Sequence, residues 1–489
     1  MSSSGERAPA AELGLLDATM IGMGAMIGAG IFVLTGLAAE IAGPAAILVF
    51  VLNGVVTAFT GLSYAELASA IPKSGGGYAF VREIFADLPS FIMGWMLWFA
   101  YMIAGALYAL GFAPNFLELL HVYGVTAAPG EVGALAVPLL SVAIPAKVGL
   151  ALVAVGGLVG LNAVSTAASG SAETIFTIIK VSILVVFVVF GFLSVNAGGE
   201  TSFTLQNFDP LFPDSKSPAS ILPAMGLTFI AFEGYDLITT VTEEVENPRE
   251  NIPKAIFFSL VATVIVYMLV VVVAIGTLGA EGLAAAGEAG IAAAATSFMP
   301  TGLPIIQNGG ALIVFGAVFS TLTALNAVVI ASSRVAFSMG REGQLLRRFG
   351  NIHHRYGTPF LAILASAVVM LASVALPTQS AGNMSSLFFL LSFIIVNGAV
   401  IKLRRERPNM NRPYEMPYYP IPAVLGIVLN SVLTVVLIVY LVQTDPLALL
   451  LSGSWILVGV GAFYGLRARR RAATDHDNTD SPIAEGGET

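Results

Sequence analysis

Long apolar stretches separated by short polar connections occupy nearly the whole chain. About 20 apolar residues suffice to cross a bilayer as a helix, and each stretch is close to that length or longer. The pattern therefore predicts an all-α integral membrane protein with twelve transmembrane helices. Their approximate ranges are 15–38, 44–70, 90–120, 146–166, 172–195, 218–241, 253–279, 305–338, 358–376, 384–403, 419–443 and 448–467.

The first apolar stretch contains a cluster of glycines that an undisturbed helix does not favour. Gly22, Gly24, Gly28 and Gly30 fall within GMGAMIGAGIFVLTG, and each glycine costs a helix interior about 1 kcal/mol relative to alanine. Irregular backbone at membrane depth is tolerated only where it is buried in protein or lines a watery cavity. We therefore expect a discontinuous first helix with a substrate site at its break.

The sixth stretch has a similar irregularity. Residues 226–236 read GLTFIAFEGYD, with Gly234 between two acidic residues. Because the two irregular stretches lie five spans apart, they predict two five-helix units, the second inverted, with a site at their shared midplane. The alternative is that these glycines only allow close helix packing. Glu233 and Asp236 are not needed for such packing and favour the site.

This pattern divides the chain into five parts. Residues 1–12 form an N-terminal tail, 13–200 the first repeat, 201–410 the second repeat, 411–468 helices 11 and 12, and 469–489 a polar tail that we expect to be disordered. The first twelve residues contain one arginine and no small-residue cleavage site after an apolar core, so a removable signal peptide is not expected.

Composition and charge support a membrane location and give an orientation. The chain is 56% hydrophobic and 11% charged, whereas soluble domains average about 25% charged residues. With the N-terminus inside, all of the 22 Lys and Arg residues fall in cytoplasmic segments except Lys147, Lys180 and Lys216. Basic residues concentrate on the cytoplasmic side, so both termini are expected there, in the plasma membrane.

The residue inventory argues against several other classes. Cysteine is absent, which excludes disulfides and thiolate sites. No nucleophile–base pair and no metal-ligand spacing lies within a span, so neither an enzyme nor a metal or other cofactor site is expected. The net charge of −8 does not indicate a nucleic-acid partner. A channel would need a continuous polar path, which the spans do not provide.

Four segments in order carry a family resemblance over essentially the whole chain. They are GAMIGAGIF (24–32), SYAELASAIPKSGGGYAFVREIF (63–85), FIAFEGYDLITTVTEEVENPRENIPKAI (229–256) and SSRVAFSMGREGQLL (332–346). They resemble signatures of the amino acid–polyamine–organocation (APC) superfamily, closest to the branch of cationic amino acid transporters and proton-coupled prokaryotic relatives. The resemblance implies a leucine-transporter-type fold, with a 5+5 inverted repeat plus two helices and with helices 1 and 6 discontinuous.

The resemblance also implies where an amino acid binds. The backbone amides of Ala29 and Gly30 would hold the substrate carboxylate, since helix N-termini favour anions. The carbonyls of Met26, Ile230 and Glu233 would accept bonds from its ammonium group. The complete predicted set consists of Met26, Ile27, Gly28, Ala29, Gly30, Ile230, Ala231, Phe232, Glu233 and Gly234.

Lys180 is the second predicted functional group. It lies about ten residues into helix 5 between apolar residues, and a lysine at bilayer depth is costly enough to indicate a functional or paired role. The alternative is that its side chain reaches the inner interface. In proton-coupled relatives a lysine here occupies the sodium position, which implies that it binds and releases a proton. By this analogy it would contact a carbonyl near Gly22 or the Thr323 hydroxyl.

The roles of the two acids of the sixth stretch are less determined. Asp236 matches a position that is often acidic in the family and is assigned to gating or proton relay. Glu233 departs from the apolar residue expected there. Ionised, it would favour cationic substrates such as lysine or arginine; protonated, it would be a hydrogen-bonded acid, and both interpretations stay open.

Several aromatic and polar residues are predicted to act as gates. Ile230 stands where some relatives have an aromatic lid, and Phe229 or Phe232 would replace it. Tyr101, Tyr108 and Asn326 are further pocket or gate candidates.

Taken together, the sequence predicts a secondary amino acid transporter that works by proton symport and alternating access. The partners expected are an amino acid, a proton and the lipid bilayer, with a monomer or a weak homo-oligomer as the assembly. The alternatives are an amino acid exchanger, a transporter of polyamines or other organocations, and an amino acid sensor without transport.

Overall fold

The computed structural model describes residues 13–73, 75–125, 134–137, 142–164, 170–196, 202–300 and 309–479. The predicted N-terminal tail, residues 1–12, and the last ten residues of the predicted C-terminal tail lie outside this description.

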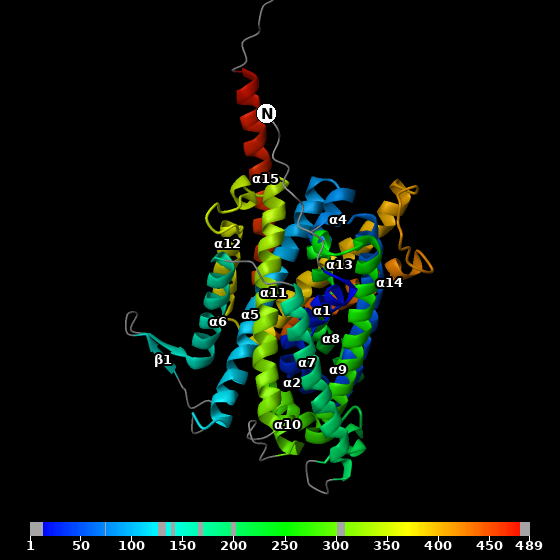
Figure 1. Ribbon diagram of the computed structural model, residues 1–489, viewed down its shortest axis with the longest axis vertical. Helices are drawn as coiled ribbons and strands as arrows, with labels where there is room; N and C mark the ends of the chain where they lie inside the picture. The colour runs from blue at the N-terminus through cyan, green and yellow to red at the C-terminus, as the bar shows by residue number, and fades with distance from the viewer. Residues whose placement is uncertain are drawn as a thin grey trace, which may run out of the picture.

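Helices dominate the described residues and run roughly parallel in one bundle (Figure 1). In the first half these are α1 (Leu15–Met26), α2 (Ala29–Ala42), α3 (Ala46–Ala70), α4 (Gly76–Ile84), α5 (Asp87–Val122), α6 (Ala146–Val164) and α7 (Gly170–Leu193). In the second half they are α8 (Ile221–Thr228), α9 (Pro248–Ala286), α10 (Gly290–Phe298), α11 (Gly309–Arg341), α12 (Phe360–Ser373), α13 (Thr378–Glu406), α14 (Ile421–Thr444) and α15 (Pro446–Thr479).

Short 3-10 helices and one hairpin complete the described elements. The 3-10 segments are η1 (Gly43–Ala45), η2 (Ser194–Asn196), η3 (Leu205–Phe208), η4 (Pro218–Ser220), η5 (Phe229–Phe232), η6 (Asp236–Glu244), η7 (Gly287–Ala289) and η8 (Arg347–Gly350). Strand β1 (Ala134–Val137) pairs antiparallel with β2 (Val142–Pro145). The prediction of a purely helical chain therefore omits one small hairpin, which projects from the side of the bundle (Figure 1).

The helices fit a multi-pass membrane protein. Among the described residues, ten stretches are long and apolar enough to span a bilayer. One of them, Leu15–Ala70, has 56 residues and is long enough for two crossings at about 1.5 Å per residue. Another predicted span is represented by the shorter α12. The last helix continues to Thr479, into the segment predicted as a disordered tail.

The bundle centre and its periphery differ in burial. The most apolar window of α5 is entirely buried, and α5 packs against α11 and α13. By contrast, α6, α7, α14 and α15 leave large apolar side chains exposed, such as Val153, Val185, Val435 and Leu457. Outward-facing apolar side chains are expected of helices that contact lipid. Any binding site is therefore placed around the buried α5.

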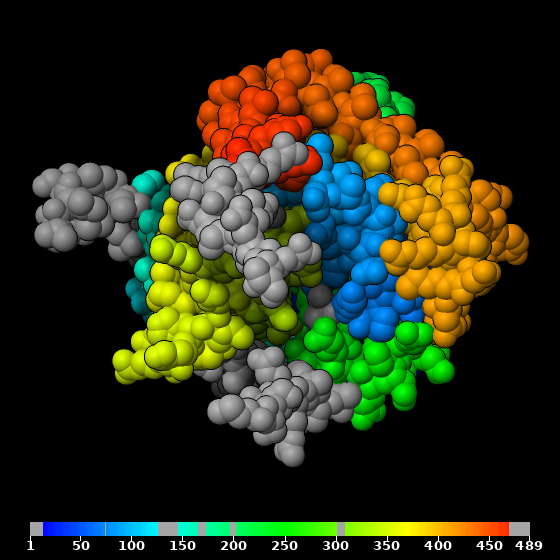
Figure 2. Space-filling model, turned by 90° about the horizontal axis from the view of Figure 1, so that it is seen from above, coloured from blue at the N-terminus to red at the C-terminus, as the bar shows by residue number. Residues whose placement is uncertain are grey.

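The two ends of the bundle carry different charge. One end, at the top of Figure 1, contains α4, η8 and the segment between α13 and α14, with Arg82, Arg348, Arg407 and Arg412. We call it the basic end. Figure 2 looks onto it and shows the blue α4 region beside the green start of α9 and the orange segment near residue 410. The opposite end contains η7 and α10.

Candidate functional site

The first irregular stretch is not one continuous helix, because Ile27 and Gly28 separate α1 from α2. Neighbouring segments approach this interruption too closely for a larger residue. A Cβ added to Gly28 would lie 2.5 Å from the Ala324 Cβ, and one added to Gly30 would lie 2.5 Å from the Ala231 Cβ. Glycine is thus required at both positions by close packing.

The amide side of this interruption is the buried N-terminus of α2. Gly28, the N-cap of α2, provides no side-chain cap. Helix geometry leaves the first amide groups of α2, at Ala29 and Gly30, without intrahelical acceptors. These are the two amides predicted to hold a carboxylate.

The carbonyl side is instead bonded by side chains from three other helices. The pairs are Lys180 of α7 with the Gly24 oxygen at 2.8 Å, Tyr267 of α9 with the Met26 oxygen, and Ser320 of α11 with the Ile27 oxygen. The sequence did not single out the tyrosine or the serine. Each lies on a long apolar helix among many similar residues, so only the packing of that helix against the interruption identifies it.

The second irregular stretch contains a matching interruption. After α8 and η5 the backbone is extended at Glu233, then Gly234 has a φ of +140° before η6 begins. A Cβ on Gly234 would lie 2.6 Å from the Met26 amide nitrogen, so the two interruptions touch. Tyr267 joins them, since its hydroxyl also lies 2.9 Å from the Ala231 carbonyl oxygen.

Two of the three carbonyls predicted to receive a substrate ammonium already accept bonds within the protein. The Met26 oxygen accepts from the Tyr267 hydroxyl. The Ile230 oxygen accepts from the Glu233 amide at 3.2 Å. A ligand ammonium would therefore compete with these donors or share the oxygens with them.

Asp236 and Glu233 are both buried but differ in their partners. Asp236 accepts hydrogen bonds from the Tyr101 hydroxyl and, at 3.0 Å, from the Gly234 amide. Glu233 is 3% exposed, and neither of its carboxyl oxygens has a hydrogen-bond partner among the described residues. A buried polar group without a partner is costly, so this carboxyl is the least satisfied group of the site.

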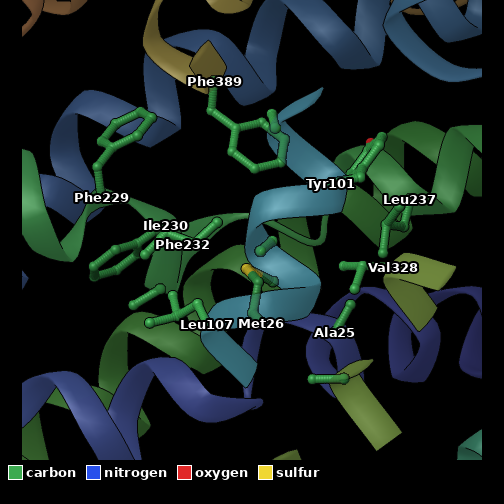
Figure 3. Close-up of a cluster of buried hydrophobic side chains, with 14 of the residues drawn as sticks. Ala25, Met26, Tyr101, Leu107, Phe229, Ile230, Phe232, Leu237, Val328 and Phe389 are labelled. Atoms are coloured by element: carbon green, nitrogen blue, oxygen red, sulfur yellow. The ribbon is translucent and has the colours of Figure 1, made fainter. Parts of the chain in front are cut away.

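Glu233 lines a small enclosed cavity between the two interruptions and α5. Tyr101, Tyr108 and Phe389 are among the other lining residues. The cavity measures about 10 Å³, which is room for about one water molecule. In Figure 3, Tyr101 and Phe389 lie above Met26. Phe389, on α13, was not predicted from the sequence.

The remaining gate candidates lie in different surroundings. Phe229 is buried against Phe393, and Phe232 packs on Phe50 and Tyr267 (Figure 3 shows Phe229 and Phe232 to the left of Met26). Asn326 does not line the central cavity, and its side-chain oxygen accepts a hydrogen bond from Asn162 at 2.7 Å.

Lys180 is completely buried. Besides the Gly24 carbonyl, its amine lies 3.0 Å from the Thr323 hydroxyl, as predicted, and 3.8 Å from a Glu173 carboxyl oxygen. The carbonyl near Gly22 that was predicted as a partner is that of Gly24. Glu173 was not singled out, although a spacing of seven residues puts it on the same helix face two turns away.

A second pocket, the vestibule, lies at the basic end. It measures about 100 Å³ and is lined in part by Glu173, Asn326 and Arg334. Ala25 and Leu237 line both the vestibule and the central cavity. The central cavity is therefore separated from the basic end by these side chains.

Direct contacts join the helices at the opposite end. Lys147 contacts both carboxyl oxygens of Glu288 at 2.6 Å and the Thr378 hydroxyl at 3.0 Å. A Cβ on Gly36 would lie 1.9 Å from the Gly287 carbonyl oxygen. These contacts tie α6, η7 and α13 together at this end.

The described residues offer no cluster of three or more His, Asp or Glu side chains that could hold a metal ion. What the two interruptions bring together instead is the N-terminal end of α2, the fully buried Lys180 and, at the central cavity, the Glu233 carboxyl group, which has no hydrogen-bond partner among the described residues. Such a set suits recognition of a small charged molecule, with groups that can hold a proton nearby.

Comparison with known proteins gives a consistent result. Residues 13–463 match the family model described as amino acid permease. The chain is similar to the branched-chain amino acid permease BcaP of Bacillus subtilis, at 30% identity over 86% of each chain. It is also similar to the serine/threonine exchanger SteT of Bacillus subtilis, at 26% identity over 94% of this chain and 97% of that one. The human cystine/glutamate transporter is 30% identical over 92% of this chain and 84% of its own.

Proposed function

This chain belongs to the amino acid permease family of the APC superfamily, and we propose that it takes up an amino acid together with a proton by alternating access. In this proposal residues 13–200 and 201–410 are the two inverted repeats, with helices 11 and 12 outside them. The substrate carboxylate binds the amides of Ala29 and Gly30. Its ammonium group binds carbonyls of the same two interruptions.

The observation that carries proton coupling is the position of Lys180. Its amine is fully buried and lies 2.8 Å from the Gly24 carbonyl oxygen, at the end of α1. A charged ammonium donates to this carbonyl and to Thr323, whereas a neutral amine has fewer protons to donate. Gain or loss of one proton therefore changes the strength of the hydrogen bond between Lys180 on α7 and the Gly24 carbonyl on α1. Protonation is in this way linked to the conformation of the site.

The cavity and the contacts at the two ends support alternating access. An amino acid is much larger than the cavity of about 10 Å³, so Tyr101 and Phe389 must separate from the interruptions before a substrate enters. The vestibule approaches the cavity from the basic end, which we assign to the cytoplasm because basic residues concentrate there. Lys147 and Glu288 hold the other end together. This combination fits a state that is closed to the outside.

Proteoliposomes test the proposed coupling. In sodium-free buffer, an inward pH gradient is expected to drive accumulation of a labelled amino acid, and Lys180→Ala is expected to abolish it. Lys402→Ala is a matched control, since Lys402 pairs with Glu406 at the basic end. A strict requirement for sodium would refute proton coupling. A strict requirement for substrate inside the vesicles would favour exchange, the activity named for SteT.

A second proposal concerns the substrate side chain and is carried by Glu233. The carboxyl groups of Glu233 and Asp236 are buried near each other, and Glu233 lacks a partner among the described residues. A positively charged substrate group would supply one, since buried charges are normally paired. We expect competition by lysine, arginine or a polyamine to exceed that by leucine, and Glu233→Gln to remove the preference. Equal competition by all of them would contradict this proposal.

A further inference from the structure

Glu173 connects the buried Lys180 to the vestibule, and neither the family comparison nor the sequence patterns assigned it a role. One of its carboxyl oxygens lies 3.8 Å from the Lys180 amine. Its side chain is 25% exposed, whereas that of Lys180 is 0% exposed. Glu173 also lines the vestibule, which Lys180 does not. It is therefore the charged group through which the buried amine meets the space at the basic end.

The surroundings hold Glu173 against α1. A Cβ on Gly24 would lie 2.5 Å from the same carboxyl oxygen and 2.2 Å from the Thr177 hydroxyl, so only glycine leaves room for both. The residue whose carbonyl accepts the bond from Lys180 is thus also the residue that makes space for Glu173. Movement of α1 at Gly24 would change both contacts together.

We propose that Glu173 is the release partner of Lys180 on the basic side: its carboxylate accepts the proton of the Lys180 ammonium and passes it to water in the vestibule. The step is balanced, because the ammonium becomes a neutral amine, the carboxylate becomes a carboxylic acid, and transfer to water restores the carboxylate. The proposal rests on the proton coupling proposed above and names the group that regulates it.

The observed distance indicates that the step is not under way in this state. A charge-assisted hydrogen bond between nitrogen and oxygen measures about 2.7–2.9 Å, so the 3.8 Å contact is an ion pair without a hydrogen bond. Transfer requires the two groups to approach by about 1 Å, which a change in the Glu173 side-chain torsions or in α1 would provide. Lys180 now donates to Gly24 and Thr323 instead.

Other titratable groups lie around Glu173 and Lys180, and they could also contribute to the pH dependence of transport. From α1, Asp17 accepts a hydrogen bond from Thr174 at 2.7 Å. From η6 and α11, Glu244 and Arg334 form an ion pair at 3.6 Å across the vestibule. From α9, the titratable group at the interruption is Tyr267. Of the charged side chains among the described residues, Glu173 is the one that forms an ion pair with the Lys180 amine.

The test compares net uptake with exchange for Glu173→Gln in proteoliposomes. Net uptake needs proton release at the basic side in every cycle, whereas exchange of labelled for unlabelled substrate at equal pH proceeds with the proton still bound. We expect Glu173→Gln to lower net uptake driven by a pH gradient at least tenfold while exchange stays within about twofold of the unchanged protein. Glu173→Asp, which retains a proton acceptor on a shorter side chain, is expected to restore part of the net uptake with a shifted pH profile.

A control variant and two contrary results separate a role in proton release from a structural role of Glu173. Glu250→Gln removes an exposed carboxylate at the same end that pairs with Lys254 rather than Lys180, and it is expected to leave both activities unchanged. Equal loss of uptake and exchange in Glu173→Gln would mean a structural ion pair and overturn the proposal, as would no loss at all. If the unchanged protein shows no response to a pH gradient, proton coupling itself fails, and this outcome is separate from any effect of Glu173.

Discussion

The contact between Gly28 and Ala324 gives the sharpest test of how the first interruption is built. A Cβ on Gly28 would lie 2.5 Å from the Ala324 Cβ, whereas ordinary contacts measure 3.4–4 Å. In Gly28→Ala, the interruption and α11 must therefore separate by about 1 Å. Overpacking of this kind costs about 1–3 kcal/mol, which corresponds to roughly 5- to 150-fold in an equilibrium constant. Because this separation would displace the Ala29 and Gly30 amides proposed to hold the substrate carboxylate, we expect substrate affinity to fall by up to that factor.

A compensating change on α11 provides the control. With Ala324→Gly, the added Cβ on Gly28 loses its 2.5 Å neighbour, and the remaining contacts are the Ala25 carbonyl oxygen at 3.2 Å and the Ala324 Cα at 3.9 Å. Ala324→Gly alone is expected to cost about 1 kcal/mol of helix stability. The double variant should therefore bind substrate more tightly than Gly28→Ala, although it carries one more substitution.

Equilibrium binding of a labelled amino acid to the purified protein measures this effect, and thermal unfolding of each variant verifies that it is folded. The reasoning predicts non-additive changes in binding free energy, as expected for two residues in direct contact. It would be refuted if Gly28→Ala bound substrate as well as the unchanged protein did. It would also be refuted if the loss of binding free energy in the double variant equalled the sum of the losses in the two single variants.

Three other regions give further predictions. Gly30→Leu is expected to abolish substrate binding without loss of expression, because its Cβ would meet the Ala231 Cα at 2.6 Å; retained binding would contradict the carboxylate assignment. Tyr267→Phe removes the hydroxyl that bonds both interruptions and should lower the free energy of unfolding by about 1–3 kcal/mol, seen as a lower Tm. Glu66→Gln breaks a bidentate pair between a fully buried carboxylate and the mostly buried Arg404 and should cost about 3–5 kcal/mol, whereas Glu83→Gln, in a partly exposed pair, should cost less than about 1 kcal/mol. Hydrogen bonds from Lys73 and Arg407 lower the pKa of Glu83. Its contribution to stability is therefore present above the ordinary carboxyl pKa and is lost as the pH falls through the lowered value. Unfolding measured over a series of decreasing pH should show the difference between Glu83→Gln and the unchanged protein become smaller toward acid pH.

Several parts of the site could be predicted from sequence because they depend on local composition. Clustered glycines at Gly28 and Gly30 indicated an irregular first helix, since glycine is costly in a helix interior. A lysine among apolar residues indicated that Lys180 has a polar partner, since an unpaired charge at that depth is costly. The family resemblance implied contact with the Thr323 hydroxyl or with a carbonyl near Gly22, and Lys180 contacts both the hydroxyl and the Gly24 carbonyl; how α7 packs on α1 decides which carbonyl it reaches.

Other parts depend on contacts between segments far apart in the chain, which no local pattern records. Tyr267 and Ser320 lie about 240 and 290 residues from the carbonyls that they contact. Phe389 and Glu173 line the central cavity and the vestibule through helix packing. Asn326, a predicted pocket or gate residue, contacts Asn162 and lines the vestibule rather than the central cavity. In each case the residue type is common and the helix face decides its role.

By itself, the sequence determined the membrane class, the positions of the apolar helices and the two irregular stretches, because bilayer thickness and helix propensity act on each segment independently. The tertiary structure decided which side chains occupy the interruptions. Donors from α7, α9 and α11 satisfy the carbonyls at the end of α1, while Glu233 stays without a partner among the described residues. The physical reason is that a broken helix exposes polar groups whatever its surroundings, but the neighbours that satisfy them are fixed only when the helices pack together.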